Sequence, residues 1–345
     1  MGNLVSKNDF PVEGRTVVIT GGSSGMGLCV GQQLAAKGAN VVIIARGREK
    51  LLRALEEIQK AAKNPETQGF LQLSADLTDP AESVRVISEI VAWNSGNPPD
   101  IVWCCAGTSH PGLFVETPVS HFKSQMESNY LSSVYMAHAT MTCWVNLAKR
   151  NQANQAGVQP SGAALPARHI IFTASFLSFY PIAGYSPYSP SKAALRSLCD
   201  TLSQESNLYA SSYPSEPRIR MHTVFPATIL TESYELENTI KPDITLKLEE
   251  DDKGQTPEVV ATKSIEGLES GRELIATTAI TALVQRSMLG GSIRGGFGRV
   301  LLDWFLACIM GIAMVFVRWD MDRAVRNWGA THGAIGKKVS ENKQT

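Results

Sequence analysis

The sequence has no excess of charge of either sign and no cysteine pattern that marks a metal site. Its 32 basic and 32 acidic residues balance, which gives no global electrostatic footprint for nucleic acid. Its six cysteines form no C-x-x-C pair and no Cys/His spacing typical of a metal ligand set, so no metal is expected. Because the cysteines fall in apolar runs, we expect them to be reduced, buried thiols.

Targeting signals and repeats are also missing. The amino-terminal residues contain no secretory hydrophobic region, the chain has no N-x-S/T sequon, and no segment repeats. These absences fit a catalytic domain that faces the cytosol. With 43% hydrophobic and 19% charged residues, the composition is not that of a disordered chain. The length of 345 residues suits one α/β domain followed by a tail.

Short hydrophobic runs alternate with segments of helical spacing along most of the chain. Strands are expected at 16–20, 40–45, 69–74, 100–105, 169–173, 218–225 and 273–278. Helices are expected at 26–37, 48–63, 121–149 and 189–210. This alternation predicts an α/β fold with a doubly wound, parallel, Rossmann-type sheet of seven strands.

A glycine-rich turn, Thr20-Gly-Gly-Ser-Ser-Gly-Met-Gly27, joins the first expected strand to the first expected helix. Glycines allow a tight turn and a close approach of the backbone to a pyrophosphate, and the helix amino terminus supplies oriented N–H groups. The turn therefore predicts a dinucleotide site. The residues expected to bind the phosphates are Gly21, Ser23, Ser24, Gly25 and Gly27.

The residues after the second and third strands indicate which dinucleotide binds. An NAD site places an acidic residue after the second strand, whereas this chain has Arg46 there and Lys50 one helical turn later. Both residues match the 2′-phosphate of NADP, so we expect NADPH. After the third strand, Asp76 and Leu77 are placed to contact the adenine. An alternative role for Asp76 is to cap the next helix.

The segment Tyr188-Ser-Pro-Ser-Lys192 places a lysine four residues after a tyrosine, on the same face of an expected helix. The ordinary pKa of a tyrosine is about 10. An ammonium about 4 Å away is worth on the order of 4 kcal/mol at an effective dielectric near 20, or roughly three pKa units. We therefore expect Lys192 to lower the pKa of Tyr188, which would donate a proton to a developing alkoxide.

Taken together, these motifs resemble the short-chain dehydrogenases/reductases over about residues 12–280. The resemblance implies a catalytic tetrad. Ser175, thirteen residues before Tyr188, would hold the substrate carbonyl oxygen. Tyr188 and Lys192 would also contact the cofactor, Lys192 at the nicotinamide ribose. Asn129, in Glu127-Ser-Asn-Tyr130, would hold a water that links Lys192 to bulk solvent.

Two segments depart from the family pattern. The family's Asn-Asn-Ala-Gly is Cys104-Cys105-Ala106-Gly107 here, which removes a side-chain amide that braces the central sheet. The family's Pro-Gly-x-Val-x-Thr is Pro226-Ala-Thr-Ile-Leu-Thr231 here. The resemblance assigns Ile229 and Thr231 to contacts with the nicotinamide amide, and alanine in place of glycine narrows the backbone conformations beside them.

Within the family, the chain is similar to the NADPH-dependent reductases that convert 3-ketosphinganine to sphinganine. The similarity lies in the glycine turn, in a polar lid at about 231–256 with Glu237-Asn, Lys241-Pro and Gln255-Thr-Pro-Glu258, and in a hydrophobic tail. Two alternatives remain. One is a membrane-bound family member that reduces a steroid, retinoid or 3-ketoacyl substrate, and the other is a catalytically silent NADPH-binding scaffold.

The tail contains fourteen uninterrupted apolar residues at Trp304–Val317, or eighteen residues from Val300 with Asp303 inside. Eighteen helical residues reach roughly 27 Å, close to a hydrocarbon thickness of about 30 Å. This predicts membrane association through residues 300–317, either spanning or monotopic. The competing interpretation is a soluble helix in a dimer interface.

The expected organisation is a catalytic domain at 1–290, with a surface insertion at about 151–167, and a membrane-associating tail at 291–345. The expected location is the endoplasmic reticulum membrane, with the catalytic domain in the cytosol. The expected substrate is a long-chain lipid ketone, and a homodimer or homotetramer is compatible with the family. The first six residues, Met1-Gly-Asn-Leu-Val-Ser6, also fit the myristoylation pattern.

Overall fold

A computed structural model describes residues 8–154, 165–288 and 296–332 of the chain. The myristoylation pattern and most of the expected insertion at 151–167 lie outside the described residues. The two ends of that insertion are described. Helix α5 includes its first residues and ends at Asn154, and Leu165 and the residues after it lead into strand β5.

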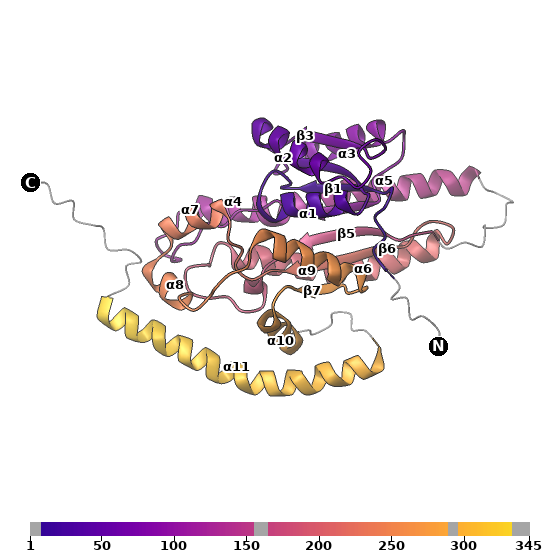
Figure 1. Ribbon diagram of the computed structural model, residues 1–345. Helices are drawn as coiled ribbons and strands as arrows, with labels where there is room; N and C mark the ends of the chain where they lie inside the picture. The colour runs from indigo at the N-terminus through magenta and orange to yellow at the C-terminus, as the bar shows by residue number, and fades with distance from the viewer. Residues whose placement is uncertain (1–7, 155–164, 289–295, 333–345) are drawn as a thin grey trace, which may run out of the picture.

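Seven strands form one parallel sheet in the order β3-β2-β1-β4-β5-β6-β7 (Figure 1). Because both faces of this sheet are covered, its strands have nearly continuous hydrophobic sequences. Short Val/Ile segments therefore predicted their positions. The strands are β1 Thr16–Thr20, β2 Asn40–Ala45, β3 Phe70–Ser74, β4 Ile101–Cys104, β5 Arg168–Thr173, β6 Ile219–Phe225 and β7 Leu274–Ala276. The predicted fold class is confirmed, and each predicted strand overlaps an observed one.

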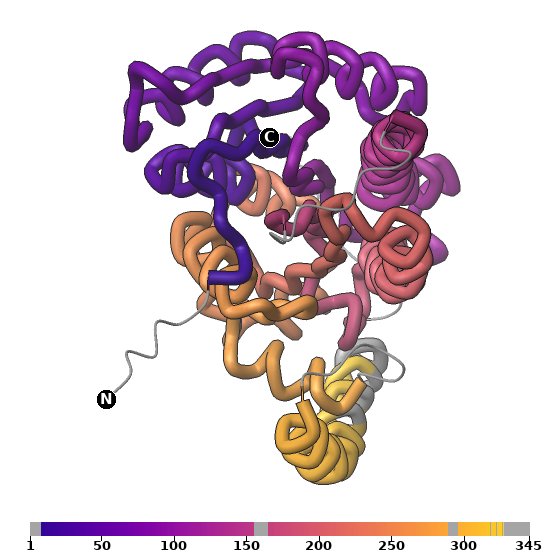
Figure 2. The backbone as a smooth tube through the Cα atoms, turned by 90° about the vertical axis from the view of Figure 1, so that its right-hand side faces the viewer, coloured from indigo at the N-terminus to yellow at the C-terminus, as the bar shows by residue number. Residues whose placement is uncertain are grey.

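Helices cover both faces of the sheet, and alternate residues of each strand point to opposite faces. Val17 and Ile19 belong to a core cluster that also contains side chains of α1 (Gly25–Ala36), α2 (Arg48–Lys60) and α9 (Pro257–Glu269). Val18 belongs to the opposite cluster. The helices on that side are α3 (Pro80–Trp93), α5 (Ser132–Asn154) and α6 (Ser189–Ser212). Figure 2 views this layered arrangement from one end.

The single helix expected at 121–149 is divided by a π turn. α4 (Val119–Met126) is followed by the π turn Glu127–Leu131 and then by α5. Single π turns inside α-helices occur frequently at functional sites, and this one contains Asn129. The expected lid contains two short helices, α7 (Glu232–Ile240) and α8 (Asp243–Leu248).

The tail forms one long helix, α11 (Phe297–His332), which follows α10 (Ala279–Ser287). It is long and apolar enough to cross a membrane by length and composition, with a mean hydropathy of 2.4. It runs along the catalytic domain beside α10 and α8 (Figures 1 and 2). Asp303 forms an ion pair with Arg286 of α10 at 3.2 Å, and Met310 and Met314 pack against the core.

The described cysteines are free thiols, as expected. Cys29, Cys104 and Cys199 are buried, and Cys105 and Cys143 are half-buried. The expectation of burial is wrong for Cys308, which is exposed. It lies in the apolar run of α11, whose outer side chains face solvent in the isolated chain.

Two histidines on neighbouring strands form a buried pair. His169 Nδ1 and His222 Nε2 are 2.9 Å apart, and His222 Nδ1 donates to the carbonyl oxygen of Arg272 at 2.8 Å. Burial lowers the pKa of His169 to about 2 and that of His222 to about 3. Both rings are therefore neutral in the folded protein at pH 5.

We expect this pair to make the protein sensitive to mild acid. Unfolded histidines titrate near 6.5, so the unfolded state binds two more protons than the folded state once the pH falls below that value. The free energy of unfolding should then fall by about 2 kcal/mol per histidine between pH 7.5 and pH 5. Urea unfolding at pH 7.5, 6 and 5 measures this loss.

The matched variants are His169→Gln and His138→Gln. His138 is exposed on α5, so its replacement should leave the pH slope unchanged, whereas His169→Gln should reduce that slope by about half. Equal slopes for the two variants would show that the buried pair does not cause the acid sensitivity.

Candidate active site

A cavity of about 1350 Å³ opens at the carboxyl ends of the strands. In doubly wound sheets, ligands bind in this crevice, where the strand order reverses. Here the reversal lies between β1 and β4. The segment after each strand contributes to the lining, in strand order Gly21, Arg46, Asp76, Gly107, Ser175, Ile229 and Thr278.

The glycine turn has the shape that a pyrophosphate requires. Gly21 has a φ of 68°, and a Cβ there would lie 2.8 Å from the backbone nitrogen of Ala106. A Cβ on Gly27 would collide with the carbonyl oxygen of Gly21. At the start of α1, Ser24 makes no side-chain cap and the first turn contains no acidic residue. The N–H groups at this helix end are therefore available to a phosphate.

Most of the predicted phosphate-binding residues line the cavity. Gly21, Ser23, Ser24 and Gly27 do so, whereas Gly25 does not. Gly25 has a φ of 53° instead, a conformation that glycine adopts at little cost. Gly25 therefore contributes to the turn through its left-handed backbone conformation and not through a contact in the cavity lining.

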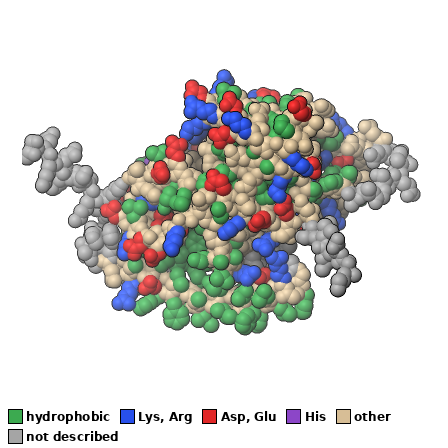
Figure 3. Space-filling model, in the orientation of Figure 1, with side chains coloured by type: hydrophobic (Ala, Val, Ile, Leu, Met, Phe, Trp, Pro, Cys, Tyr) green, Lys and Arg blue, Asp and Glu red, His purple; other side chains and the backbone are tan. Residues whose placement is uncertain are grey.

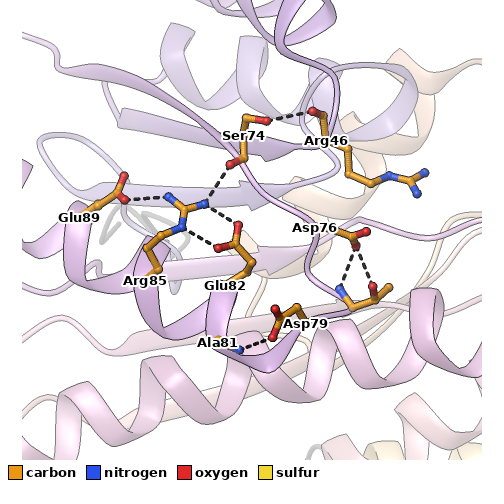
Figure 4. Close-up of polar contacts among 9 residues, drawn as sticks. Arg46, Ser74, Asp76, Asp79, Ala81, Glu82, Arg85 and Glu89 are labelled. Carbon is orange, nitrogen blue, oxygen red and sulfur yellow. Dashed lines mark hydrogen bonds and ion pairs between the residues drawn. The ribbon is translucent and has the colours of Figure 1, made fainter.

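The residues expected at the ribose and adenine all line the cavity, and Figure 4 shows the polar contacts of two of them, Arg46 and Asp76. Arg46 is exposed, and its carbonyl oxygen accepts a hydrogen bond from Ser74 at 2.9 Å. Lys50 forms an exposed ion pair with Glu232 of α7 at 3.4 Å. Lys50 thus connects α2 to the first lid helix, α7.

The alternative role of Asp76 as a helix cap is wrong. Asp79 caps α3, since its carboxylate accepts from the Ala81 N–H at 2.9 Å. Asp76 accepts from the N–H and hydroxyl of Thr78, at 3.1 and 2.8 Å, and remains in the cavity lining together with Leu77.

Three of the four predicted catalytic residues line the same cavity: Ser175, Tyr188 and Lys192. Ser175 precedes a short turn and accepts a hydrogen bond from the Leu177 N–H at 3.1 Å. Tyr188 immediately precedes α6, and Lys192 lies in the first turn of that helix. The Lys192 Nζ atom donates to the carbonyl oxygen of Thr173 at 2.9 Å and lies 5.7 Å from the centre of the Tyr188 ring.

The expected lowering of the Tyr188 pKa by Lys192 is not found in this structure. Burial raises the pKa of Tyr188, the carboxylate of Glu237 raises it further, and the Ser175 hydroxyl lowers it. Burial lowers the pKa of Lys192 itself to about 8. Desolvation therefore favours the neutral form of both groups, contrary to the lowering of the Tyr188 pKa that their spacing predicted.

Asn129 is fully buried and does not line the cavity. Its Oδ1 atom accepts from the Thr108 N–H at 2.8 Å. Its Nδ2 atom donates to the Thr108 carbonyl and to Ser191 Oγ, both at 3.0 Å. A Cβ on Gly107 would lie 2.6 Å from Asn129 Oδ1 and 3.2 Å from Lys192 Nζ, so both atoms border the small space that this glycine leaves open.

The two departures from the family pattern have local consequences. Cys105 accepts a hydrogen bond from the Thr173 hydroxyl at 3.6 Å, and burial raises the pKa of both Cys104 and Cys105 to about 12. These thiols are therefore neutral. Ile229 and Thr231 both line the cavity, but the Thr231 hydroxyl also caps α7 by accepting from the Tyr234 N–H at 3.1 Å.

The sequence analysis did not anticipate a buried charge cluster between the lid and the tyrosine segment. Lys241 is fully buried and pairs with Glu237 at 3.3 Å and with Glu249 at 2.7 Å. The hydroxyl of Tyr185 donates to Glu237 Oε1 at 2.6 Å. The four-residue spacing of Glu237 and Lys241 is a signal that could have indicated an ion pair, but nothing in the sequence indicates that the pair is buried.

Comparison with known proteins agrees with this geometry. Residues 15–240 match the family described as short chain dehydrogenase. The chain is 46% identical over 334 residues to a 3-ketodihydrosphingosine reductase of Aspergillus fumigatus, covering 94% of this chain and 88% of that one. It is 40% identical to a 3-ketodihydrosphingosine reductase of Neurospora crassa, covering 96% and 87%.

More distant similarities extend the comparison. A 3-dehydrosphinganine reductase of Danio rerio is 33% identical over 258 residues, covering 75% of this chain and 69% of that one. A solved short-chain dehydrogenase/reductase of Mycobacterium ulcerans superposes with a TM-score of 0.61, covering 77% of this chain and 89% of that one. Because the sequence identity to this solved structure is 19%, the superposition supports the fold alone.

Proposed function

This chain belongs to the short-chain dehydrogenase family, and on that basis we propose that it reduces 3-ketosphinganine to sphinganine with NADPH, as a step of sphingolipid biosynthesis. The observation that carries the proposal is the placement of Ser175, Tyr188 and Lys192 in one cavity with the glycine turn. Relatives named as reductases of this ketone, similar along nearly the whole chain, support the choice of substrate.

The residues around the carbonyl would act as follows. The glycine turn, Arg46 and Lys50 would hold NADPH, which would supply the hydride that the ketone carbon accepts. The Ser175 hydroxyl holds the carbonyl oxygen, where negative charge develops. The Tyr188 hydroxyl donates its proton to that oxygen, which gives the alcohol. A phenol with a raised pKa remains protonated at pH 7 and is still a far stronger acid than an alcohol, whose pKa is close to the value of about 15.7 for water.

Lys192 and Asn129 would act on the proton donor. The Lys192 ammonium, beside the Tyr188 ring, stabilises the phenolate that remains after proton transfer, and it binds the nicotinamide ribose. Asn129 Oδ1 and Lys192 Nζ both border the space beside Gly107. A water held there would return a proton from solvent, as the family resemblance implies.

The cavity has an apolar part that suits a long alkyl chain. Side chains of the segment after β5, of both lid helices and of α10 and α11 supply it; these are Phe176, Leu177, Ile182, Leu236, Ile240, Leu248, Ile280 and Met321. Because Met321 belongs to α11, the cavity reaches the tail helix. A lipid ketone could therefore enter from the side on which α11 lies.

We propose that residues 1–290 form the catalytic domain and that residues 291–345 attach it to the membrane of the endoplasmic reticulum, with the domain in the cytosol. Exposed hydrophobic side chains gather along α11 at the lower edge of the molecule (Figure 3). The inner side of the helix is held to the domain through Asp303, Met310 and Met314. The outer side of the helix is then available to membrane lipid.

The experiment that tests the function measures NADPH oxidation by the purified full-length chain in detergent. The ketones offered are 3-ketosphinganine, a steroid ketone and a 3-ketoacyl thioester. We expect 3-ketosphinganine to be reduced with the highest kcat/KM and sphinganine to be the product. A higher kcat/KM on either of the other ketones would refute the proposed substrate. The absence of reduction with all of them would favour a silent NADPH-binding protein.

We expect Arg46→Ala to remove the preference for NADPH over NADH. An arginine–phosphate contact is worth about 1.5–3 kcal/mol, so the KM for NADPH should rise by about 10- to 100-fold while the KM for NADH changes little. Steady-state kinetics with both cofactors measures this. Arg53→Ala, an exposed position on α2 outside the cavity lining, is the control and should leave both values unchanged. Equal changes in both KM values would contradict the role of Arg46.

A further inference from the structure

We propose, building on the function above, that Glu237 binds the ammonium group that 3-ketosphinganine carries on the carbon next to the reacting ketone. Glu237 would then determine specificity for amino ketones, separately from the residues that reduce the carbonyl. The proposal depends on where this carboxylate lies, on the charge around it and on which of its oxygens remains available.

Glu237 lies in the cavity, one side chain away from the proton donor. It is on α7, lines the cavity and has a side chain that is 13% exposed. Its Oε1 atom accepts from the Tyr185 hydroxyl at 2.6 Å. The Tyr185 ring centre is 5.9 Å from the ring centre of Tyr188. A group held by Glu237 would therefore be close to a carbonyl that hydrogen-bonds to Tyr188.

The charge cluster around Glu237 has a negative excess. Glu237 and Glu249 share one ammonium, that of Lys241, which also lies 4.3 Å from the centre of the Tyr234 ring. Two carboxylates and one ammonium carry a net charge of −1. Because the cluster is largely out of water, a cation brought to it is attracted more strongly than at an exposed site.

One oxygen of Glu237 remains available to a ligand. Tyr185 and Lys241 both contact Oε1, whereas Oε2 accepts no hydrogen bond from any residue that the structure describes. A carboxylate held through one oxygen by a tyrosine and a lysine is well positioned, since its rotamer is set before a ligand arrives.

The substrate has the complementary group. An amine beside polar substituents, like a protein α-amino group, titrates near about 8, so most of it is an ammonium at pH 7. The amine carbon is bonded directly to the carbonyl carbon. An ammonium at Glu237 and a carbonyl at Tyr188 therefore fit one bound molecule. The Glu237 carboxylate raises the pKa of Tyr188, and a bound ammonium would offset this effect.

The test compares two ketones with and without the carboxylate. The substrates are 3-ketosphinganine and the same ketone with hydrogen in place of the amine, assayed at pH 7 with the full-length chain and saturating NADPH. We expect Glu237→Gln to lower kcat/KM for the amino ketone by about 10- to 100-fold, mainly through KM. For the deaminated ketone kcat/KM should not fall, because this ketone has no ammonium to bind and loss of the carboxylate lowers the pKa of Tyr188. Glu237→Asp, which keeps the charge, should recover part of the preference.

Glu235→Gln is the matched control. Glu235 is on the same helix but is exposed and outside the cavity lining. Its replacement should therefore leave kcat/KM unchanged for both ketones. An equal loss on both ketones in Glu237→Gln would overturn the inference, because it would indicate a purely structural role. A wild-type protein that reduces both ketones equally well would overturn it too. A wild-type protein that reduces neither ketone would instead refute the proposed function itself.

Discussion

Replacement of Tyr188 by phenylalanine is expected to lower kcat for ketone reduction by about 10²- to 10⁴-fold, the usual contribution of a positioned general acid. The ring is half-buried in the cavity lining, and phenylalanine keeps its shape. Only the hydroxyl that donates the proton is lost. Binding of NADPH, measured by calorimetry, should therefore change by less than about twofold.

The matched control for this variant is Tyr209→Phe. Tyr209 is on the same helix, α6, but packs against the core outside the cavity lining, so its hydroxyl cannot reach a substrate. Wild-type turnover in Tyr188→Phe would refute the proposed proton transfer. Loss of NADPH binding in that variant would show that the hydroxyl also holds the cofactor.

A second large effect is expected from the outer face of α11. Phe305, Ile309, Ile312 and Phe316 recur at helical spacing and are 57%, 48%, 66% and 67% exposed. Complete transfer of one such side chain from water to an apolar environment is favourable by about 1.5–3 kcal/mol. Replacement of all four by serine should lower partition into phospholipid vesicles by at least about 100-fold, measured by vesicle flotation. Reduction of a ketone dissolved in detergent should persist, since the residues that hold α11 to the domain are unchanged.

The control replaces three exposed hydrophobic residues elsewhere. Leu52, Val84 and Leu208 are on α2, α3 and α6 and are 53%, 58% and 65% exposed. Their replacement by serine should leave vesicle binding intact, because they do not form one continuous apolar face with α11. Binding that survives in the fourfold α11 variant, or falls equally in the control variant, would contradict membrane attachment through this helix.

The strands and the glycine turn were predicted closely because the signals for them are local. Val and Ile runs in β1 and β2 give the sheet, and the positions of Gly21 and Gly27 require glycine for reasons of close backbone approach. A helix after the third strand was expected without bounds, and its cap is Asp79 in place of Asp76. Helix α9 was not predicted, although Thr256-Pro257 is a local signal for a helix start.

The electrostatics of the site were not predictable in the same way. Spacing placed Lys192 beside Tyr188, and the structure has them together, yet burial and Glu237 raise the pKa of Tyr188. A pKa depends on solvent exposure and on every nearby charge, and these come from residues distant in the chain. For the same reason the buried Lys241 cluster was not foreseen.

The amino-acid order alone determined the parallel sheet, the cofactor turn, the Tyr188–Lys192 pair and the apolar tail, because each follows from residues a few positions apart. The tertiary structure alone decided three matters: the acidity of Tyr188, the position of Glu237 one side chain away from it, and the course of α11 along the domain. Burial and contacts between distant segments arise only when the chain is folded, and they govern both charge and membrane-facing surface.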